Sequence, residues 1–276
     1  MKQPIRTLFF VVALCGLVAS AHAATVFQAG FETLPLGYIT TTENGGGVGD
    51  ASNQVDGRWR TVGTIYGDPA VVDTISKSGE NSLRLSRRNA GQSALGWTTG
   101  GAVPNNTLFE FSYWANPVSG GSWIMSVNNY SYIQTNTPVS LYIDPSSNLQ
   151  VREMRDDGNL IWHDTGTDIT VGSWTGIKAV VTNLGDGSST VAGRGFYDAY
   201  VNTGTGWTLA YSNIGFNSSL LYNGINAVSL NPQAPTDSVS GYMDDVAITY
   251  VPEPATLLLL GLGSVILGRR SHRNKN

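Results

Sequence analysis

A repeated pattern of short strand-like runs over residues 25–250 is the feature that most restricts the fold. Runs rich in Val, Ile, Thr and aromatic residues alternate with clusters of Gly, Asn, Asp, Pro or Ser at intervals of about 8–12 residues. Apolar residues do not recur with helical spacing over any long stretch, and no internal repeat is visible. The pattern predicts an all-β fold, namely a single sandwich of two antiparallel sheets.

Five runs are the clearest predicted strands. In the first of them, Phe109, Phe111 and Tyr113 alternate with other residues and therefore share one face, and in the last Val246 and Ile248 do the same. Because side chains alternate, each sheet should have one face in the core and one face toward water. The five runs are residues 108–114, 149–154, 174–181, 196–201 and 242–250.

The first 23 residues have the features of a cleaved export signal. A basic start is followed by an apolar stretch over residues 8–18 and then by Ala-His-Ala at residues 21–23, a signal-peptidase pattern. We therefore expect a signal helix at residues 1–23, signal peptidase as a partner during export, and a mature chain that begins at Ala24. Cys15, the only cysteine, lies in the removed segment, so the mature chain has neither a disulfide nor a cysteine-ligated metal site.

The charge of the mature domain excludes nucleic acid as an expected partner. Residues 24–251 carry ten Lys and Arg against nineteen Asp and Glu, a net charge of −9. Binding of polyphosphate requires a clustered basic face, whereas this part of the chain is acidic.

The chain ends in three different segments. Pro252, Glu253 and Pro254 can continue neither a strand ladder nor a helix. They are followed by residues 255–268, a largely apolar and Gly-containing run of about 21 Å as a helix, and then by the basic residues Arg269 and Arg270. The run is short for a span, but it has no polar face, and the basic end is typical of a cytoplasmic flank. We expect a short C-terminal transmembrane helix with the domain outside.

In this order, the triplet, the short span and the Arg-rich end resemble the PEP-CTERM sorting signal, here residues 251–276. The resemblance implies recognition by an exosortase, with Pro252, Glu253, Pro254, Arg269 and Arg270 as the signal residues. It also implies transient anchoring in the inner membrane and then delivery to the cell surface or extracellular matrix of a Gram-negative bacterium. The alternative is a plain C-terminal anchor, for which a Pro-Glu-Pro triplet has no role.

Residues 24–250 are similar to the concanavalin A-like or laminin-G-like jelly roll. The resemblance rests on the order of several short stretches, which are FQAGFE at 27–32, SGENSLRL at 78–85, GSWTGI at 172–177 and YMDDVAI at 242–248. It implies that the domain is a jelly-roll sandwich whose first and last strands lie side by side.

The same resemblance implies a structural calcium ion where these two strands meet. Glu32 and Asp245 are then the candidate side-chain ligands, and Ser78 or Gly79 would offer a carbonyl oxygen. A hard cation of this kind takes six to eight oxygen ligands. Asp244 would face away from Asp245 in a regular strand. The alternative is that Glu32 is an exposed strand end and Asp245 a solvated residue.

No catalytic motif is visible, and we expect the protein not to be an enzyme. The alternating acids of laminarinase-type hydrolases, the Gln-x-His strand of alginate lyases and a Gly-x-Ser-x-Gly elbow are absent. His163 is the only histidine of residues 24–250, and such a residue at a strand edge is most often at the surface or hydrogen-bonded. If the protein were a polysaccharide hydrolase or lyase, its catalytic acids would have to be a pair that comes from different strands.

Aromatic residues favour a binding role instead. Trp123, Tyr130 and Tyr132 flank an Asn-rich turn, and an aromatic face is a platform for sugar rings. The alternative for each ring is a place in the core. We therefore expect an exported surface or matrix protein that is associated with exopolysaccharide as a carbohydrate-binding or adhesive module. An inert structural matrix protein and, less favoured, a polysaccharide hydrolase or lyase are the alternatives.

Overall fold

A computed structural model describes most of the region between the two terminal segments. The described residues are 24–32, 34, 36–38, 58–62, 70–87, 93–97, 103, 107–128, 138–154, 157, 159–185, 193–216, 225, 227–233 and 238–250. They form strands, turns and loops and contain no α-helix. The predicted all-β fold is therefore confirmed for this part of the chain.

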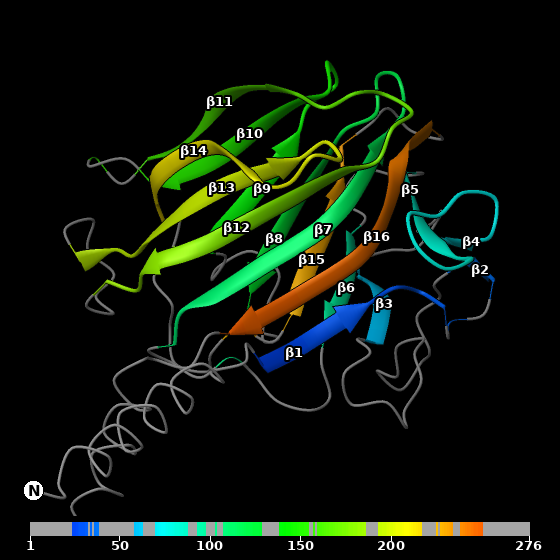
Figure 1. The fold of residues 1–276 in the computed structure, drawn as a ribbon, viewed down its shortest axis with the longest axis horizontal. Coiled ribbons are helices and arrows are strands. Elements are labelled where there is room, and N and C mark those ends of the chain that lie inside the picture. Colours follow the sequence, from blue (N-terminus) through cyan, green and yellow to red (C-terminus); the bar gives the residue numbers. More distant parts are fainter. Residues whose placement is uncertain are drawn as a thin grey trace, which may run out of the picture.

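The strands form two antiparallel sheets, which are stacked with β12, β7 and β16 in front of β8 and β15 (Figure 1). The first sheet, sheet A, has the order β14-β13-β12-β7-β16-β5-β4-β2, with β1 also paired to β16. Its strands are β1 (Ala24–Ala29), β2 (Gly37–Tyr38), β4 (Ala70–Val72), β5 (Ser82–Arg87), β7 (Phe109–Pro117), β12 (Thr175–Asn183), β13 (Phe196–Asn202), β14 (Thr208–Gly215) and β16 (Ser238–Tyr250).

The second sheet, sheet B, has the order β11-β10-β9-β8-β15-β6-β3. Its strands are β3 (Arg58–Val62), β6 (Ser93–Trp97), β8 (Trp123–Asn128), β9 (Val139–Ile143), β10 (Asn148–Met154), β11 (Leu160–Asp168) and β15 (Ala227–Pro232). Each of the five predicted strands is present, with ends that differ by a few residues from the prediction. The two-sheet antiparallel sandwich is confirmed, and its assignment to the concanavalin A-like family stays a prediction.

The core lies between the sheets and follows the predicted alternation. Phe109, Phe111 and Tyr113 of β7 are buried, whereas the residues between them are only half-buried. Sheet B contributes Trp123, Met125 and Val127 of β8 and Leu141 of β9 to the same core. The side chains that point away from this core therefore form the two outer faces of the sandwich.

Strand β16 has two partners in succession on one of its sides. Residues 238–243 pair with β5, and residues 246–250 pair with β1, from Ala29↔Val246 to Ala24↔Tyr250. The predicted neighbourhood of the first and last strands is confirmed. Between the two pairings, the ladder with β7 shifts register after Asp244, and Asp245 has a φ of 48°. This is a β-bulge, which inserts one extra residue on β16.

The predicted signal helix at residues 1–23 and the predicted transmembrane helix lie outside the described residues. Within the described residues, no helix has the length and apolar character needed to cross a membrane.

Candidate functional site

The outer face of sheet A carries two tryptophans that meet over a glycine. Trp114 lies on β7, opposite Gly176 of β12, and the ring centroids of Trp114 and Trp207 are 6.5 Å apart with an interplanar angle of 46°. A methyl group at Gly176 would lie 3.0 Å from Cη2 of Trp207 and 3.4 Å from Cη2 of Trp114. The absence of a side chain at Gly176 therefore lets both rings lean over β12. We call Trp114, Trp207 and Gly176 the tryptophan platform.

A tight loop between β13 and β14 places Trp207 on the platform. The Asn202 side-chain oxygen accepts hydrogen bonds from the backbone N–H groups of Gly204 at 2.8 Å and Gly206 at 3.1 Å. Gly204 and Gly206 have φ values of 110° and 117°, in the region that favours glycine. Trp207 is 40% exposed, although a ring of this size usually finds a place in a core. The loop thus holds an aromatic ring at the surface.

Two lysines lie over the rings of this face. Lys77 Nζ is 4.3 Å from the ring centroid of Trp114, and Lys178 Nζ is 4.9 Å from that of Trp207, both within the range of cation–π attraction. Lys178 also lies 3.6 Å from the Glu110 carboxylate and 5.4 Å from the ring centroid of Tyr200. The platform is therefore bordered by charged groups and hydrogen-bonding side chains, the mixture that a hydroxyl-rich ligand requires.

A second group of polar residues lies where β1, β5 and the bulge of β16 meet. Here the turn at residues 76–81, which precedes β5, receives three carboxylates from distant parts of the chain. Glu32 accepts hydrogen bonds from the backbone N–H groups of Glu80, at 3.0 and 3.1 Å, and Asn81, at 3.0 Å. Asp244 accepts from the N–H groups of Lys77 at 2.9 Å and Ser78 at 3.1 Å. We call Glu32, Asp244, Asp245 and this turn the acidic junction.

Asp245 reaches the same turn as its neighbour. Its Oδ1 accepts a 2.8 Å hydrogen bond from the Ser78 hydroxyl. The expectation that Asp244 and Asp245 face opposite ways is wrong, because it assumed a regular strand and the bulge with its left-handed residue breaks the alternation. Asp244, which sequence reasoning set aside, is the most buried of the three carboxylates, with 0% of its surface exposed.

The pKa of Asp244 is raised to about 6, chiefly by burial and also by the adjacent charge of Asp245, against the lowering effect of hydrogen bonds from three backbone N–H groups. Among the described residues, none of the three carboxylates of the junction forms an ion pair with Lys or Arg. The junction therefore concentrates negative charge that no Lys or Arg of the described part of the chain pairs with.

Calcium prefers carboxylate and carbonyl oxygens. At this junction, however, both oxygens of Glu32 and both oxygens of Asp244 already accept backbone N–H groups. Glu32 and Asp245, the predicted ligands, do converge on the turn that contains Ser78 and Gly79. However, no three Asp, Glu, His or Cys side chains of the described chain are arranged to hold a metal by themselves. Backbone carbonyl oxygens would have to complete the ligand set.

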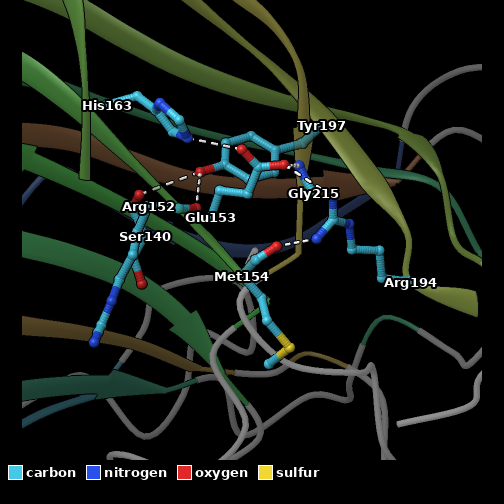
Figure 2. Close-up of polar contacts among 8 residues, drawn as sticks. All are labelled: Ser140, Arg152, Glu153, Met154, His163, Arg194, Tyr197 and Gly215. Atoms are coloured by element: carbon cyan, nitrogen blue, oxygen red, sulfur yellow. Dashed lines mark hydrogen bonds and ion pairs between the residues drawn. The ribbon is translucent and has the colours of Figure 1, made fainter. Parts of the chain in front are cut away.

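A third polar cluster closes the edge of the sandwich at which β10 and β11 approach β14 (Figure 2). Glu153 Oε2 lies 2.7 Å from His163 Nε2, and Glu153 Oε1 accepts from Arg194 at 3.1 Å and from the backbone N–H of Gly215 at 3.3 Å. Arg194 also donates to the carbonyl oxygen of Met154. Both oxygens of Glu153 are thus occupied by groups of the protein. We call Glu153, His163 and Arg194 the edge clasp.

Tyr197 joins the two sheets beside the clasp. It comes from β13 of sheet A, and its hydroxyl donates to the carbonyl oxygens of Ser140 at 3.3 Å and Arg152 at 3.1 Å in sheet B (Figure 2). Burial raises the pKa of Tyr197 above its usual value, so the hydroxyl stays protonated and remains a donor. The ring of His163 stacks on Tyr211 with centroids 5.6 Å apart. These contacts account for His163 as part of the packing of this edge.

Of the three predicted sugar-binding residues, the structure describes only Trp123, and it lies in the core. Trp123 is completely buried, and a methyl group at Gly241 would lie 2.6 Å from its Cζ3 atom. Its ring therefore belongs to the core and presents no face to solvent. Tyr130 and Tyr132 lie outside the described residues, as do Pro252, Glu253, Pro254, Arg269 and Arg270.

The tryptophan platform was missed, although one signal for Trp114 was available. The prediction that Phe109, Phe111 and Tyr113 face the core requires Trp114, the next residue, to face outward. No comparable signal exists for Trp207, since its position depends on a loop and on the strand register that brings Gly176 beneath it.

Comparison with known proteins identifies the tail. Residues 251–273 match the PEP-CTERM protein-sorting motif. This motif implies processing by an exosortase and export with anchoring in the membrane before release to the cell surface. No curated protein matches this sequence.

Several solved structures resemble the sandwich. Domain 4 of AbnA, a GH43 extracellular arabinanase from Geobacillus stearothermophilus solved with arabinotriose, is 15% identical, over 85% of this chain and 97% of that chain, with a TM-score of 0.46. The binding domain of botulinum neurotoxin serotype G is 12% identical over 87% of this chain, with a TM-score of 0.43, and 51% of the neurotoxin chain is covered. The carbohydrate-binding module CBM66 from Bacillus subtilis is 10% identical over 69% of this chain and 94% of that chain, with a TM-score of 0.38.

Proposed function

We propose that this protein is an exported, non-catalytic polysaccharide-binding protein of the cell surface or matrix. Its C-terminal signal directs it outward, and the tryptophan platform binds the glycan. The observation that carries the proposal is the pair of rings on the outer face, the exposed Trp207 and the half-buried Trp114, which meet over Gly176.

The platform suits a sugar chain for physical reasons. The apolar faces of pyranose rings stack on indole rings, and their hydroxyl groups bond to polar side chains around the stack. Lys77 and Lys178 lie over the rings and Glu110 is paired with Lys178, so these groups provide donors and an acceptor at the platform. The rings come from a sheet and a restrained loop, so little conformational entropy is lost on binding.

The edge clasp supports a non-catalytic role. Its titratable groups, Glu153 and His163, bond to each other, and Glu153 is also bonded by Arg194 and Gly215. A carboxylate with both oxygens occupied in this way lacks the free acid or base that glycoside hydrolysis requires. The acidic junction is assigned a structural role, with calcium as its proposed ion.

Binding to immobilised polysaccharides tests the proposal. The full chain is applied to wells coated with xylan, arabinan, laminarin, alginate, polygalacturonate or the exopolysaccharide of the producing bacterium. We expect saturable binding to at least one of them and a loss of about tenfold or more in affinity for Trp207→Ala and for Trp114→Ala. Val171→Ala, which trims another exposed apolar residue (47% exposed), should bind like the wild type.

Three results would overturn the proposal. The first is the absence of binding to every polysaccharide, which favours the inert structural alternative. The second is unchanged, wild-type affinity in both Trp114→Ala and Trp207→Ala, which places the site elsewhere. The third is the release of reducing ends or unsaturated uronates from a bound polysaccharide, which favours a hydrolase or lyase.

A further inference from the structure

The outer face of sheet B carries a second surface cluster of aromatic rings. Tyr142 of β9 and Trp162 of β11 lie on either side of β10, with ring centroids 5.2 Å apart and an interplanar angle of 48°. Leu141 and Ile143, the neighbours of Tyr142 on β9, are completely buried, so Tyr142 points away from the core. Both rings are half-buried, in contrast to the completely buried rings between the sheets.

An arginine adds charge to this cluster. Arg152 of β10 lies directly opposite Trp162 in the ladder, and its guanidinium carbon is 5.4 Å from the Trp162 ring centroid. Among the described residues, the Arg152 side chain forms no ion pair, and its Nε–H has no hydrogen-bond acceptor. Because this Nε atom is buried, a ligand would be bound by the terminal N–H groups of the planar guanidinium, which suit a sugar hydroxyl or carboxylate oxygen.

A side-chain amide lies beside Tyr142. Gln150 is the partner of Tyr142 in the ladder, and its amide nitrogen donates to Asp144 at 2.9 Å. Asp144 is itself held by the N–H groups of Ser146 at 2.8 Å and Asn148 at 2.9 Å. The polar groups beside Tyr142 are therefore positioned by the turn between β9 and β10. We call Tyr142, Trp162 and Arg152 the sheet B cluster.

The two surface clusters lie on opposite faces of the molecule. The tryptophan platform is on the outer face of sheet A and the sheet B cluster is on the outer face of sheet B, while stacked sheets are about 10 Å apart with the core between them. One extended polysaccharide chain cannot lie on both faces. A ligand on each face therefore means two different chains, or two distant segments of one chain.

We propose that the sheet B cluster is a second polysaccharide-binding site, and that one copy of this protein cross-links two pyranose-based polysaccharide chains. The proposal rests on the proposed function, because it assigns the same class of ligand to the opposite face. Stacking on Tyr142 and Trp162 supplies the apolar contact, and Arg152 supplies the polar one. An exported protein of this design connects strands of an extracellular matrix, so binding and a structural role become one activity.

A bead assay separates cross-linking from simple binding. Beads coated with polygalacturonate or xylan, or with the producer's exopolysaccharide, are incubated with the full chain and washed. The same polysaccharide, soluble and fluorescently labelled, is then added. The wild type should capture the labelled polysaccharide on the beads, because one face is occupied by the bead and the other is free.

Variants of either face should keep binding and lose capture. We expect Trp162→Ala to bind coated beads about as well as the wild type through the platform, and Trp207→Ala to bind them with the roughly tenfold lower affinity of the remaining face. Each variant should reduce capture of the labelled chain about tenfold or more, and the double variant should bind no beads. Arg152→Gln and Tyr142→Ser test the same face in case Trp162→Ala does not fold, and Val171→Ala is the matched control.

The outcomes distinguish this proposal from the proposed function. Normal capture by the foldable sheet B variants overturns the second site and leaves the platform intact. Loss of capture accompanied by a change from dimer to monomer in sedimentation also overturns it, since sheet B would then be a protein interface. If no polysaccharide binds the wild type, both proposals fail. If only the sheet B variants abolish binding, the platform fails and the sheet B cluster stands as a binding site without cross-linking.

Discussion

Asp244 and Asp245 are consecutive residues of one strand, and both carboxylates bond to Ser78. Asp244 accepts from the Ser78 backbone N–H at 3.1 Å, and Asp245 accepts from the Ser78 hydroxyl at 2.8 Å. In a regular strand, neighbouring side chains point to opposite faces, so this convergence is produced by the bulge at which Asp245 has a φ of 48°. With Glu32, the pair links the start and the end of the domain through the turn at residues 76–81.

The first prediction concerns calcium at the acidic junction. Addition of calcium to the metal-free full chain should raise its Tm, because an ion bound only by the folded state stabilises that state. Glu32→Gln and Asp245→Asn should each remove most of this rise, since each variant loses a charged oxygen ligand. Thermal unfolding with calcium or with a chelator measures the effect. A Tm that does not respond to calcium in the wild type would exclude the ion.

The second prediction concerns the pH dependence of stability. The pKa of Asp244 is raised from 3.8 to about 6, so the folded state binds this proton more tightly than the unfolded state does. Without calcium, the contribution of Asp244 to stability is fully present below about pH 4 and is lost as the pH rises through 6. The shift corresponds to a loss of roughly 3 kcal/mol in the free energy of unfolding.

Urea unfolding at a series of pH values between 4 and 7 measures this loss as a difference between two proteins. Asp244→Asn should be less stable by a constant amount, because an amide cannot accept all the N–H groups that the carboxylate accepts, but it should lack the part of the slope that is due to Asp244. Calcium should reduce the slope in the wild type, because a cation favours the ionised carboxylate. Identical slopes for the two proteins would contradict the assignment.

The fold could be predicted from the sequence to the extent that side-chain alternation determines it. The alternation of Phe109, Phe111 and Tyr113 correctly indicated a half-buried strand, and a motif-based resemblance correctly placed the first strand beside the last. The tail was identified because its triplet, apolar run and basic end are contiguous in the chain. Local sequence patterns were therefore sufficient to predict the all-β fold and the sorting signal.

The candidate sites were less predictable, because they depend on contacts between distant strands. The bulge that turns Asp244 toward Ser78 is not encoded by a local turn motif. Trp207 meets Trp114 only because both flank Gly176, which is far from either of them in sequence. Trp123 was chosen for its place beside an Asn-rich turn, but proximity to a turn does not determine which face of a strand a residue occupies.

The third prediction concerns the edge clasp. Glu153→Gln should lower the free energy of unfolding by about 2 kcal/mol, because the carboxylate is only 19% exposed and bonds to His163 and Arg194. The matched control is Glu110→Gln, which breaks the 3.6 Å pair with Lys178 at a carboxylate that is 36% exposed and should cost less than about 1 kcal/mol. Urea titration of both variants measures the difference. Equal costs would show that the clasp contributes no more than a surface pair.

The last prediction concerns the different effects on stability of replacing Trp123 and Trp207. Trp123→Ala should destabilise the protein by about 3–5 kcal/mol, because it empties a completely buried site between the sheets. That is a large fraction of the roughly 5–15 kcal/mol by which domains are stable, so loss of glycan binding in this variant would report unfolding. Trp207→Ala removes a ring that is 40% exposed and should change the urea midpoint little while it weakens binding. If Trp123→Ala instead had nearly wild-type stability and impaired binding, Trp123 would belong to the ligand site.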